Sequence, residues 1–187
     1  MLLVMAATTA GAQQSTKPIR IRIETQLGNI DAELDSVRAP VTVTNFLRYV
    51  DAHLYDDGTF FRTVTMANQP ADAVKIEVIQ GGAPVTNRAK GFPAIPLERT
   101  SVTHLHHGDG TLSVARGGPD SGTDQFFVVI NDQPELDFGG RRNSDGQGFA
   151  AFGHVTAGMD IVRKIQSQPA KGQSLETPVS ILRIIRR

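Results

Sequence analysis

The feature that most constrains the fold is a strict alternation of apolar and charged residues near the start of the chain. Residues 19–24 (IRIRIE) and residues 30–35 (IDAELD) both follow this pattern. Successive side chains of a strand point to opposite faces, so the alternation is typical of half-buried strands. Gly28-Asn29 lies between the two segments and is a hairpin signal. The chain therefore predicts an antiparallel hairpin with one face in a core.

The period of the pattern changes after Pro40. Apolar residues then follow at helical spacing (i, i+3, i+4, i+7), namely Val43, Phe46, Leu47 and Val50. This spacing forms one apolar face of a helix, and a proline suits its first turn. A second helix is expected over residues 157–165. The two helices stand far apart in the sequence, with strand-like segments between them.

The remaining pattern is one of short strands and long connections. Strands are expected at residues 59–63, 75–80, 111–115, 126–130, 149–155 and 179–185. Loops are expected at residues 65–74, 82–108 and 132–148, which lack a sustained period. Eighteen glycines and ten prolines fit a turn-rich chain. Many short strands with two separated helices favour a mainly β, closed or nearly closed antiparallel barrel capped by helices.

Composition limits the classes of function. A chain of 187 residues fits one domain, here residues 19–187, and 40% hydrophobic with 20% charged residues indicates a globular protein. Nineteen basic and nineteen acidic side chains cancel, so no global field attracts nucleic acid. The absence of cysteine excludes disulfides, thiolate metal sites and cysteine nucleophiles.

The first residues predict a targeting segment. Residues 1–12 (MLLVMAATTAGA) are apolar and small and end in Ala10-Gly11-Ala12, an A-x-A cleavage signal. We expect a signal peptide cleaved after Ala12, a polar lead-in over residues 13–18, and a periplasmic or secreted protein without stable membrane association after cleavage. A positively charged segment before the apolar run is missing, which leaves two explanations: the true start lies upstream, or the segment is a disordered tail.

Several motifs then carry a resemblance. They are Phe60-Phe61-Arg62, residues 79–82 (IQGG) and residues 112–127 (LSVARGGPDSGTDQFF), supported by Ala39-Pro40, Asn45-Phe46, Phe152-Gly153 and residues 158–160 (GMD). In this order the chain resembles the cyclophilin family of peptidyl-prolyl cis-trans isomerases from about Ile19 to Ile185. In detail it looks like the bacterial exported branch. The resemblance implies a closed eight-stranded antiparallel β-barrel capped by two α-helices.

The chemistry of that family sets simple demands on a site. Amide resonance opposes rotation about an X–Pro bond with a barrier of ~18–20 kcal/mol. No bond breaks, so no nucleophile, metal or cofactor is required; a site need only bind the twisted bond better than the planar one. A fixed donor near the prolyl nitrogen and an apolar pocket for the ring meet this demand. The implied partners are proline-containing polypeptides, and we expect a monomer.

The resemblance also implies the site residues. Arg62 would be the donor, Gln80 would hold a substrate carbonyl, and Phe127 would form the floor of the proline pocket. The other implied substrate-binding residues are Phe61, Val78, Ala115, Arg116, Gly117, Gln125, Leu136 and Phe149, of which 115–117 would present backbone groups. Structural roles are the alternatives: a surface arginine on a strand, a strand-end amide, or a phenylalanine in the core.

Two features leave other functions open. Glu77 falls where the family has an aromatic pocket residue, and Arg62 and Gln80 are unusually far apart. Either the insertion supplies another apolar side chain, such as Met66, or the register is shifted. A proline-binding module or chaperone with little turnover is therefore the second hypothesis. The histidines of residues 104–107 raise a separate alternative, a metal site. No carboxylate pair near them completes a coordination shell, so we expect a solvated loop instead. A metal-dependent enzyme is therefore the remote third hypothesis.

Overall fold

The computed structural model describes residues 18–88 and 90–187. The predicted signal peptide, residues 1–12, and all but Pro18 of the polar lead-in lie outside the described residues. No helix among the described residues is both long enough and apolar enough to span a bilayer.

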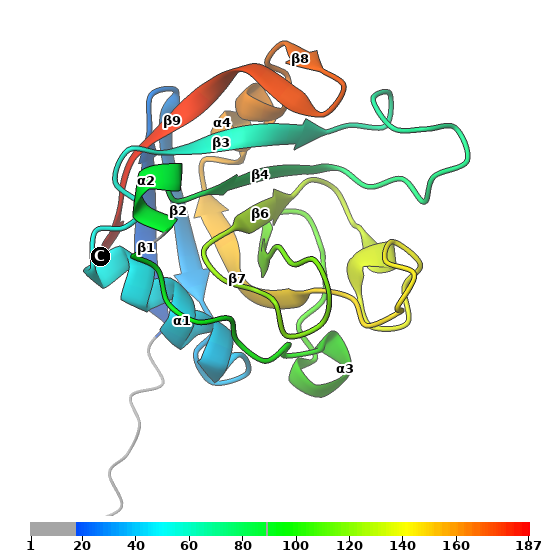
Figure 1. Ribbon diagram of the computed structural model, residues 1–187, viewed down its shortest axis with the longest axis horizontal. Helices are drawn as coiled ribbons and strands as arrows, with labels where there is room; N and C mark the ends of the chain where they lie inside the picture. The colour runs from blue at the N-terminus through cyan, green and yellow to red at the C-terminus, as the bar shows by residue number, and fades with distance from the viewer. Residues whose placement is uncertain (1–17, 89) are drawn as a thin grey trace, which may run out of the picture.

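Eight antiparallel strands close into a barrel (Figure 1). Neighbouring strands follow the order β1 (Ile19–Thr25), β2 (Gly28–Leu34), β7 (Ala150–Ala157), β5 (Thr111–Val114), β6 (Phe126–Val129), β4 (Val78–Gly82), β3 (Gly58–Val64) and β9 (Ser174–Arg186). Pairing of β1 with β9 closes the ring. The two-residue strand β8 (Ala170–Lys171) pairs only with β9. The predicted barrel is confirmed.

Two longer helices lie on opposite sides of the barrel, α1 (Pro40–Asp51) and α4 (Met159–Gln166) (Figure 1). The prediction of two capping helices is incomplete, because α2 (Val85–Arg88) and α3 (Thr100–Thr103) each form one further turn. Both short helices fall in the 82–108 segment, where no regular structure was expected. A 3-10 turn, Pro134–Leu136, also interrupts the predicted 132–148 loop. One turn is too short to produce an apolar period.

The barrel lumen is filled by side chains. Phe60, Phe126 and Phe152 point inward from three strands, and each is fully buried. Phe46 of α1 packs against Phe126 edge to face, with ring centroids 5.5 Å apart. Aromatic rings in this arrangement contribute beyond their buried area. The interior is therefore a packed core, and a substrate must bind elsewhere.

Two strands begin more than two residues away from the predicted start. β4 begins at Val78 rather than Lys75, because the side-chain amide of Gln69 takes the backbone hydrogen bonds of Ile76. β9 begins at Ser174, five residues before the predicted start, and its first residues pair with β8 and β3. Only Leu175 is buried among residues 174–178, so this part of the strand has no alternating pattern.

Candidate active site

The register of three neighbouring strands places the predicted catalytic residues side by side. Arg62 of β3 is opposite Gln80 of β4, and Gln80 is opposite Phe127 of β6. In the next row, Val64 is opposite Val78 and Val78 is opposite Val129. Cross-strand partners share one face of a sheet. An arginine, a glutamine and a phenylalanine therefore form a polar-to-apolar row beside a row of valines.

A β-bulge at Phe61 decides which way Arg62 faces. Phe60 pairs with Gly81 while Arg62 pairs with Gln80, so β3 uses one more residue than β4 between these two pairs. Regular alternation would put Arg62 on the same face as Phe60, which points into the core. The extra residue reverses the alternation, so Arg62 and Val64 face outward. Phe61 is the extra residue and is half-buried.

The outward face of the strands carries its own apolar cluster. Phe126 belongs to the barrel core, whereas Phe127 belongs to a second cluster outside it. The buried members of this outer cluster are Val64, Ile76, Val78, Phe127, Val129 and Leu136, with Ala115 and Phe149 packed against them. The ring of Phe149 meets that of Phe127 edge to face at 5.3 Å. The cluster supplies an apolar floor and wall outside the barrel.

A cavity of about 200 Å³ opens onto this cluster. Eight of the predicted site residues line it: Arg62, Val78, Gln80, Ala115, Arg116, Phe127, Leu136 and Phe149. Ile76, Arg142 and Asn143, which sequence reasoning did not select, also line it. Phe61, Gly117 and Gln125 are not among the lining residues, but Gln125 is hydrogen-bonded to two that are: its side chain accepts from Gln80 Nε2 and its backbone carbonyl accepts from Ala115 N.

Amide side chains hold the Arg62 guanidinium. Its Nη1 donates to Gln80 Oε1 at 2.7 Å, and its Nε and Nη2 donate to Gln173 Oε1 at 3.0 and 2.5 Å. The amide nitrogen of Gln80 donates to Gln125 Oε1 at 2.8 Å. Burial lowers the pKa of Arg62, and the positive charge of Arg142 lowers it further. Neutral partners thus orient the guanidinium and leave its charge unneutralised. Gln173 had no sequence signal, since it lies in the turn between β8 and β9.

The position of Glu77 is resolved by the strand geometry. Ile76 and Val78 face the outer cluster on either side of Glu77. Glu77 points the other way, and its carboxylate accepts from Asn131 Nδ2 at 2.8 Å and Gln166 Nε2 at 3.4 Å. Ile76, rather than Met66, supplies the apolar side chain that the insertion was expected to provide; Met66 is 51% exposed. No carboxylate therefore faces the apolar floor from this strand.

Arg116 was expected to present backbone groups to the substrate, and its side chain has a structural role as well. Its side chain is 1% exposed and forms a bidentate ion pair with Asp145, with N–O distances of 2.7 and 2.9 Å. Its Nε donates to Gly148 O at 2.7 Å, and the guanidinium lies over the Phe149 ring, 5.1 Å from the centroid. Arg116 therefore fixes the loop that carries the Phe149 wall.

His107 contradicts the expectation of a solvated loop. Its side chain is fully buried and stacks on Phe127, with ring centroids 6.1 Å apart. Its two ring nitrogens contact Asp137 Oδ1 at 2.6 Å and Ser113 Oγ at 2.9 Å. Burial raises the pKa of Asp137, but hydrogen bonds from His107 and His106 outweigh it and the net pKa is lowered. His107 thus backs the pocket floor. His104 and His106 are exposed, as expected.

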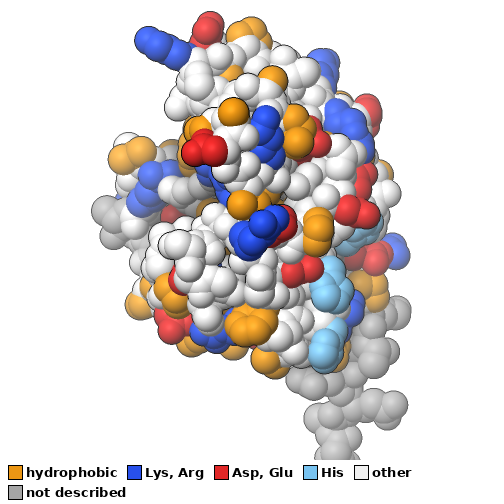
Figure 2. Space-filling model, turned by 90° about the vertical axis from the view of Figure 1, so that its right-hand side faces the viewer, with side chains coloured by type: hydrophobic (Ala, Val, Ile, Leu, Met, Phe, Trp, Pro, Cys, Tyr) orange, Lys and Arg blue, Asp and Glu red, His pale blue; other side chains and the backbone are white. Residues whose placement is uncertain are grey.

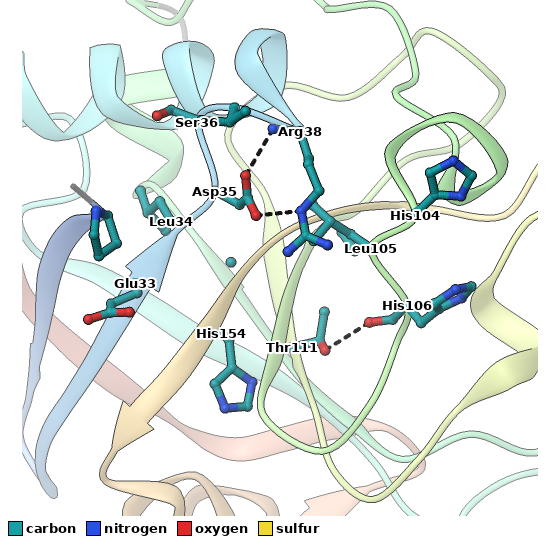
Figure 3. A pocket seen from close by; sticks show the side chains of 14 residues that line it. Glu33, Leu34, Asp35, Ser36, Arg38, His104, Leu105, His106, Thr111 and His154 are labelled. Atoms are coloured by element: carbon teal, nitrogen blue, oxygen red, sulfur yellow. Dashed lines mark hydrogen bonds and ion pairs between the residues drawn. The ribbon is translucent and has the colours of Figure 1, made fainter. Parts of the chain in front are cut away.

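A larger hollow of about 650 Å³ lies elsewhere, near the start of β1 (Figure 3). Two charged residues of its lining pair with each other, because Asp35 accepts a hydrogen bond from Arg38 Nε at 2.6 Å. The labelled rings of His104, His106 and His154 point in different directions (Figure 3). Among residues 18–88 and 90–187, no cluster of three metal-ligating side chains occurs. The smaller cavity, where donor and apolar floor meet, is the candidate site.

Comparisons with known proteins match the chain to one family. The family model described as "Cyclophilin type peptidyl-prolyl cis-trans isomerase/CLD" matches residues 20–186. A peptidyl-prolyl cis-trans isomerase of Acinetobacter baylyi is 34% identical over 88% of this chain and 82% of its own length. Peptidyl-prolyl cis-trans isomerase B of Escherichia coli is 31% identical over 78% of this chain and 83% of its own.

Solved structures show the same fold. A cyclophilin type peptidyl-prolyl cis-trans isomerase of Cryptosporidium parvum superposes with a TM-score of 0.73 at 22% identity, covering 91% of this chain and 98% of that one. A structure of the same protein in the presence of the dipeptide Ala-Pro gives a TM-score of 0.71. The barrel and these matches agree: the chain belongs to the family of cyclophilin-type peptidyl-prolyl cis-trans isomerases.

Proposed function

We propose that the protein accelerates rotation of X–Pro peptide bonds in exported polypeptides, using the cavity lined by Arg62 and Phe127. The observation that carries the proposal is the position of a charged guanidinium beside an apolar slot, on adjacent strands of a rigid barrel. The apolar slot can hold a proline ring. The guanidinium can donate a hydrogen bond to the nitrogen of that ring.

The physical basis is differential binding of the twisted bond. As the imide rotates, conjugation is lost and the lone pair returns to the prolyl nitrogen. A donor fixed near that nitrogen stabilises the twisted state more than either planar state, which lowers the barrier. Gln80 and Gln173 hold Arg62 in place without neutralising it. Phe127, Leu136 and Phe149 exclude water from the proline ring, which strengthens the donor interaction.

The competing function is a proline-binding module with little turnover. It depended on two features: the long insertion between Arg62 and Gln80, and Glu77, whose carboxylate would weaken the pocket if it faced the proline ring. Glu77 instead contacts Asn131 and Gln166 on the other face of the strand. The geometry therefore favours turnover.

A pair of arginine variants tests the role of Arg62. We expect Arg62→Ala to lower kcat/KM on an Ala-Pro peptide by about 10²–10³-fold, as for loss of a donor used only in the transition state. Arg20→Ala is the matched control, because Arg20 also lies on a strand but is exposed and pairs with Glu33. Isomerisation is followed by NMR exchange. Equal activity of both variants would refute the proposal, and peptide binding without acceleration in wild type would favour the binding module.

Export is proposed from the sequence of residues 1–12. An apolar run that ends in Ala10-Gly11-Ala12 has the form of a signal peptide with its cleavage site. Expression of the chain in a Gram-negative host, followed by fractionation and N-terminal sequencing, tests this. We expect a periplasmic product that begins at Gln13. An uncleaved product confined to the cytoplasm would overturn the export proposal and leave the isomerase proposal intact.

A further inference from the structure

Among the described residues, those that line the candidate active site include cations and no acidic residue. Arg62, Arg116 and Arg142 are the charged residues among those that line the cavity. Arg116 is neutralised by its ion pair with Asp145. Within the described part of the chain, neither Arg62 nor Arg142 has a carboxylate within ion-pairing distance. Two positive charges therefore share the cavity without a counter-charge from the described residues.

Arg142 joins two loops that project from the same side of the barrel, residues 65–77 and 137–149 (Figure 1). Its Nη1 donates to Gln69 Oε1 at 3.1 Å and to the Val74 carbonyl at 2.8 Å. These neutral acceptors hold the side chain at the rim of the cavity. Figure 2 looks onto this side of the molecule and shows basic side chains near the middle of the face, with acidic side chains beside them.

The environment of Arg142 makes its charge effective. Burial lowers the pKa of Arg142, and its charge in turn lowers the pKa of Arg62. Charges that are partly removed from water interact more strongly with a ligand than exposed ones. The neighbouring Arg141 differs, because it is 76% exposed and pairs with Glu135. Arg141 lies outside the cavity lining.

The next residue adds an unused donor. Asn143 lines the same cavity, and its Nδ2 is buried with no acceptor among the described residues. A buried polar group without a partner is costly, so a ligand that brings an acceptor gains from the site. A carboxylate offers two acceptor oxygens and a negative charge.

We propose that Arg142 makes this site selective for peptides that carry an acidic residue next to the proline. The inference rests on the proposed isomerase function and names its preferred substrate class. Arg62 acts on the imide of every substrate, whereas Arg142 pairs with the carboxylate of the neighbouring Glu or Asp. The carboxylate of the substrate would thus provide the negative charge that Arg142 lacks among the described residues.

Matched peptides test the preference. Two series are measured by NMR exchange, with Glu, Gln or Lys either directly before or directly after the proline, and Gln serves as the neutral isostere. We expect wild-type kcat/KM to be about three- to tenfold higher for Glu than for Gln in at least one series, and lower for Lys than for Gln. The Glu/Gln ratio should fall toward 1 at about 1 M salt, where the screening length is about 3 Å.

Three variants separate charge from structure. Arg142→Gln keeps hydrogen-bond donors for the loop but loses the charge, and should bring the Glu/Gln ratio close to 1. Arg142→Lys should retain most of the preference. Arg141→Gln, which removes the adjacent exposed charge, should leave the ratio as in wild type. A ratio of 1 in both wild-type series, or an equal loss in Arg141→Gln and Arg142→Gln, would overturn the inference. Absence of isomerisation on every peptide would instead overturn the proposed function.

Discussion

Two arginines of the pocket are held by different partners, and the partners determine what each can do. Asp145 neutralises Arg116 with two hydrogen bonds, so this side chain acts as an anchor for the loop that ends at Phe149. Arg62 is held by amide oxygens, which orient a guanidinium but leave its charge available. Burial of a charge with neutral acceptors costs free energy that an ion pair would offset. That cost is expected at a residue that acts on a substrate.

The ion pair between Arg116 and Asp145 should affect how the stability of the protein depends on pH. The hydrogen bond from Arg116, helped by the Gln147 backbone, lowers the pKa of Asp145 to about 2. The carboxyl binds protons more readily in the unfolded chain, so its contribution is complete above the unfolded pKa, near 4, and is lost as pH falls toward 2. Denaturation curves between pH 5 and pH 2 should therefore show a steeper loss of unfolding free energy for wild type than for Asp145→Asn. Parallel curves would contradict this.

At the scale of elements, helix α1 is capped by a residue distant in sequence. Ala39 precedes the helix and has no side chain that can accept a hydrogen bond from its first turn. Glu98 supplies the acceptor instead: its carboxylate oxygens accept from Val41 N at 3.0 Å and Thr42 N at 2.7 Å. A negative charge at this position also favours the helix dipole. One side chain thus ties the long 90–99 segment to the helix that closes one side of the barrel.

Removal of this cap should destabilise the whole domain. We expect Glu98→Ala to lower the free energy of unfolding by about 1 kcal/mol, the usual cost of losing an N-terminal cap, and Glu98→Gln by less because one acceptor remains. Urea denaturation measures the change. Glu176→Ala, at an exposed position on β9, serves as the control and should stay within about 0.5 kcal/mol of wild type. An effect of Glu98→Ala no larger than that of the control would show that the cap is dispensable.

At the scale of the whole molecule, closure of the barrel forces the site to the outside. Phe60, Phe126 and Phe152 fill the lumen, and Phe46 of α1 packs on Phe126 and Phe152, so no room remains for a peptide. The same strands present their other face to a second apolar cluster, where Phe127 is the floor. Adjacent residues of β6 therefore serve two purposes, since side chains alternate across a strand.

Much of the architecture could be predicted from local pattern. The alternation in residues 19–24 and 30–35 predicted the β1–β2 hairpin, and the spacing of Val43, Phe46, Leu47 and Val50 predicted α1. Motif order predicted the barrel and nominated Arg62, Gln80 and Phe127. Short-range patterns of this kind can be read from the sequence, because hydrophobic period and turn chemistry are properties of the chain itself.

The arrangement of the pocket was decided by contacts between distant segments. The bulge that turns Arg62 outward exists only in the pairing of β3 with its neighbours, and Gln173 reaches Arg62 from 111 residues away. Three other features likewise depend on how loops pack: Ile76 rather than Met66 lines the pocket, His107 is buried, and Arg142 lines the cavity. The sequence by itself determined the eight barrel strands in outline, the two longer helices and the apolar faces that form the barrel core. Only the tertiary structure decided which side chains meet, because cross-strand register and loop docking are set by partners that no local pattern specifies.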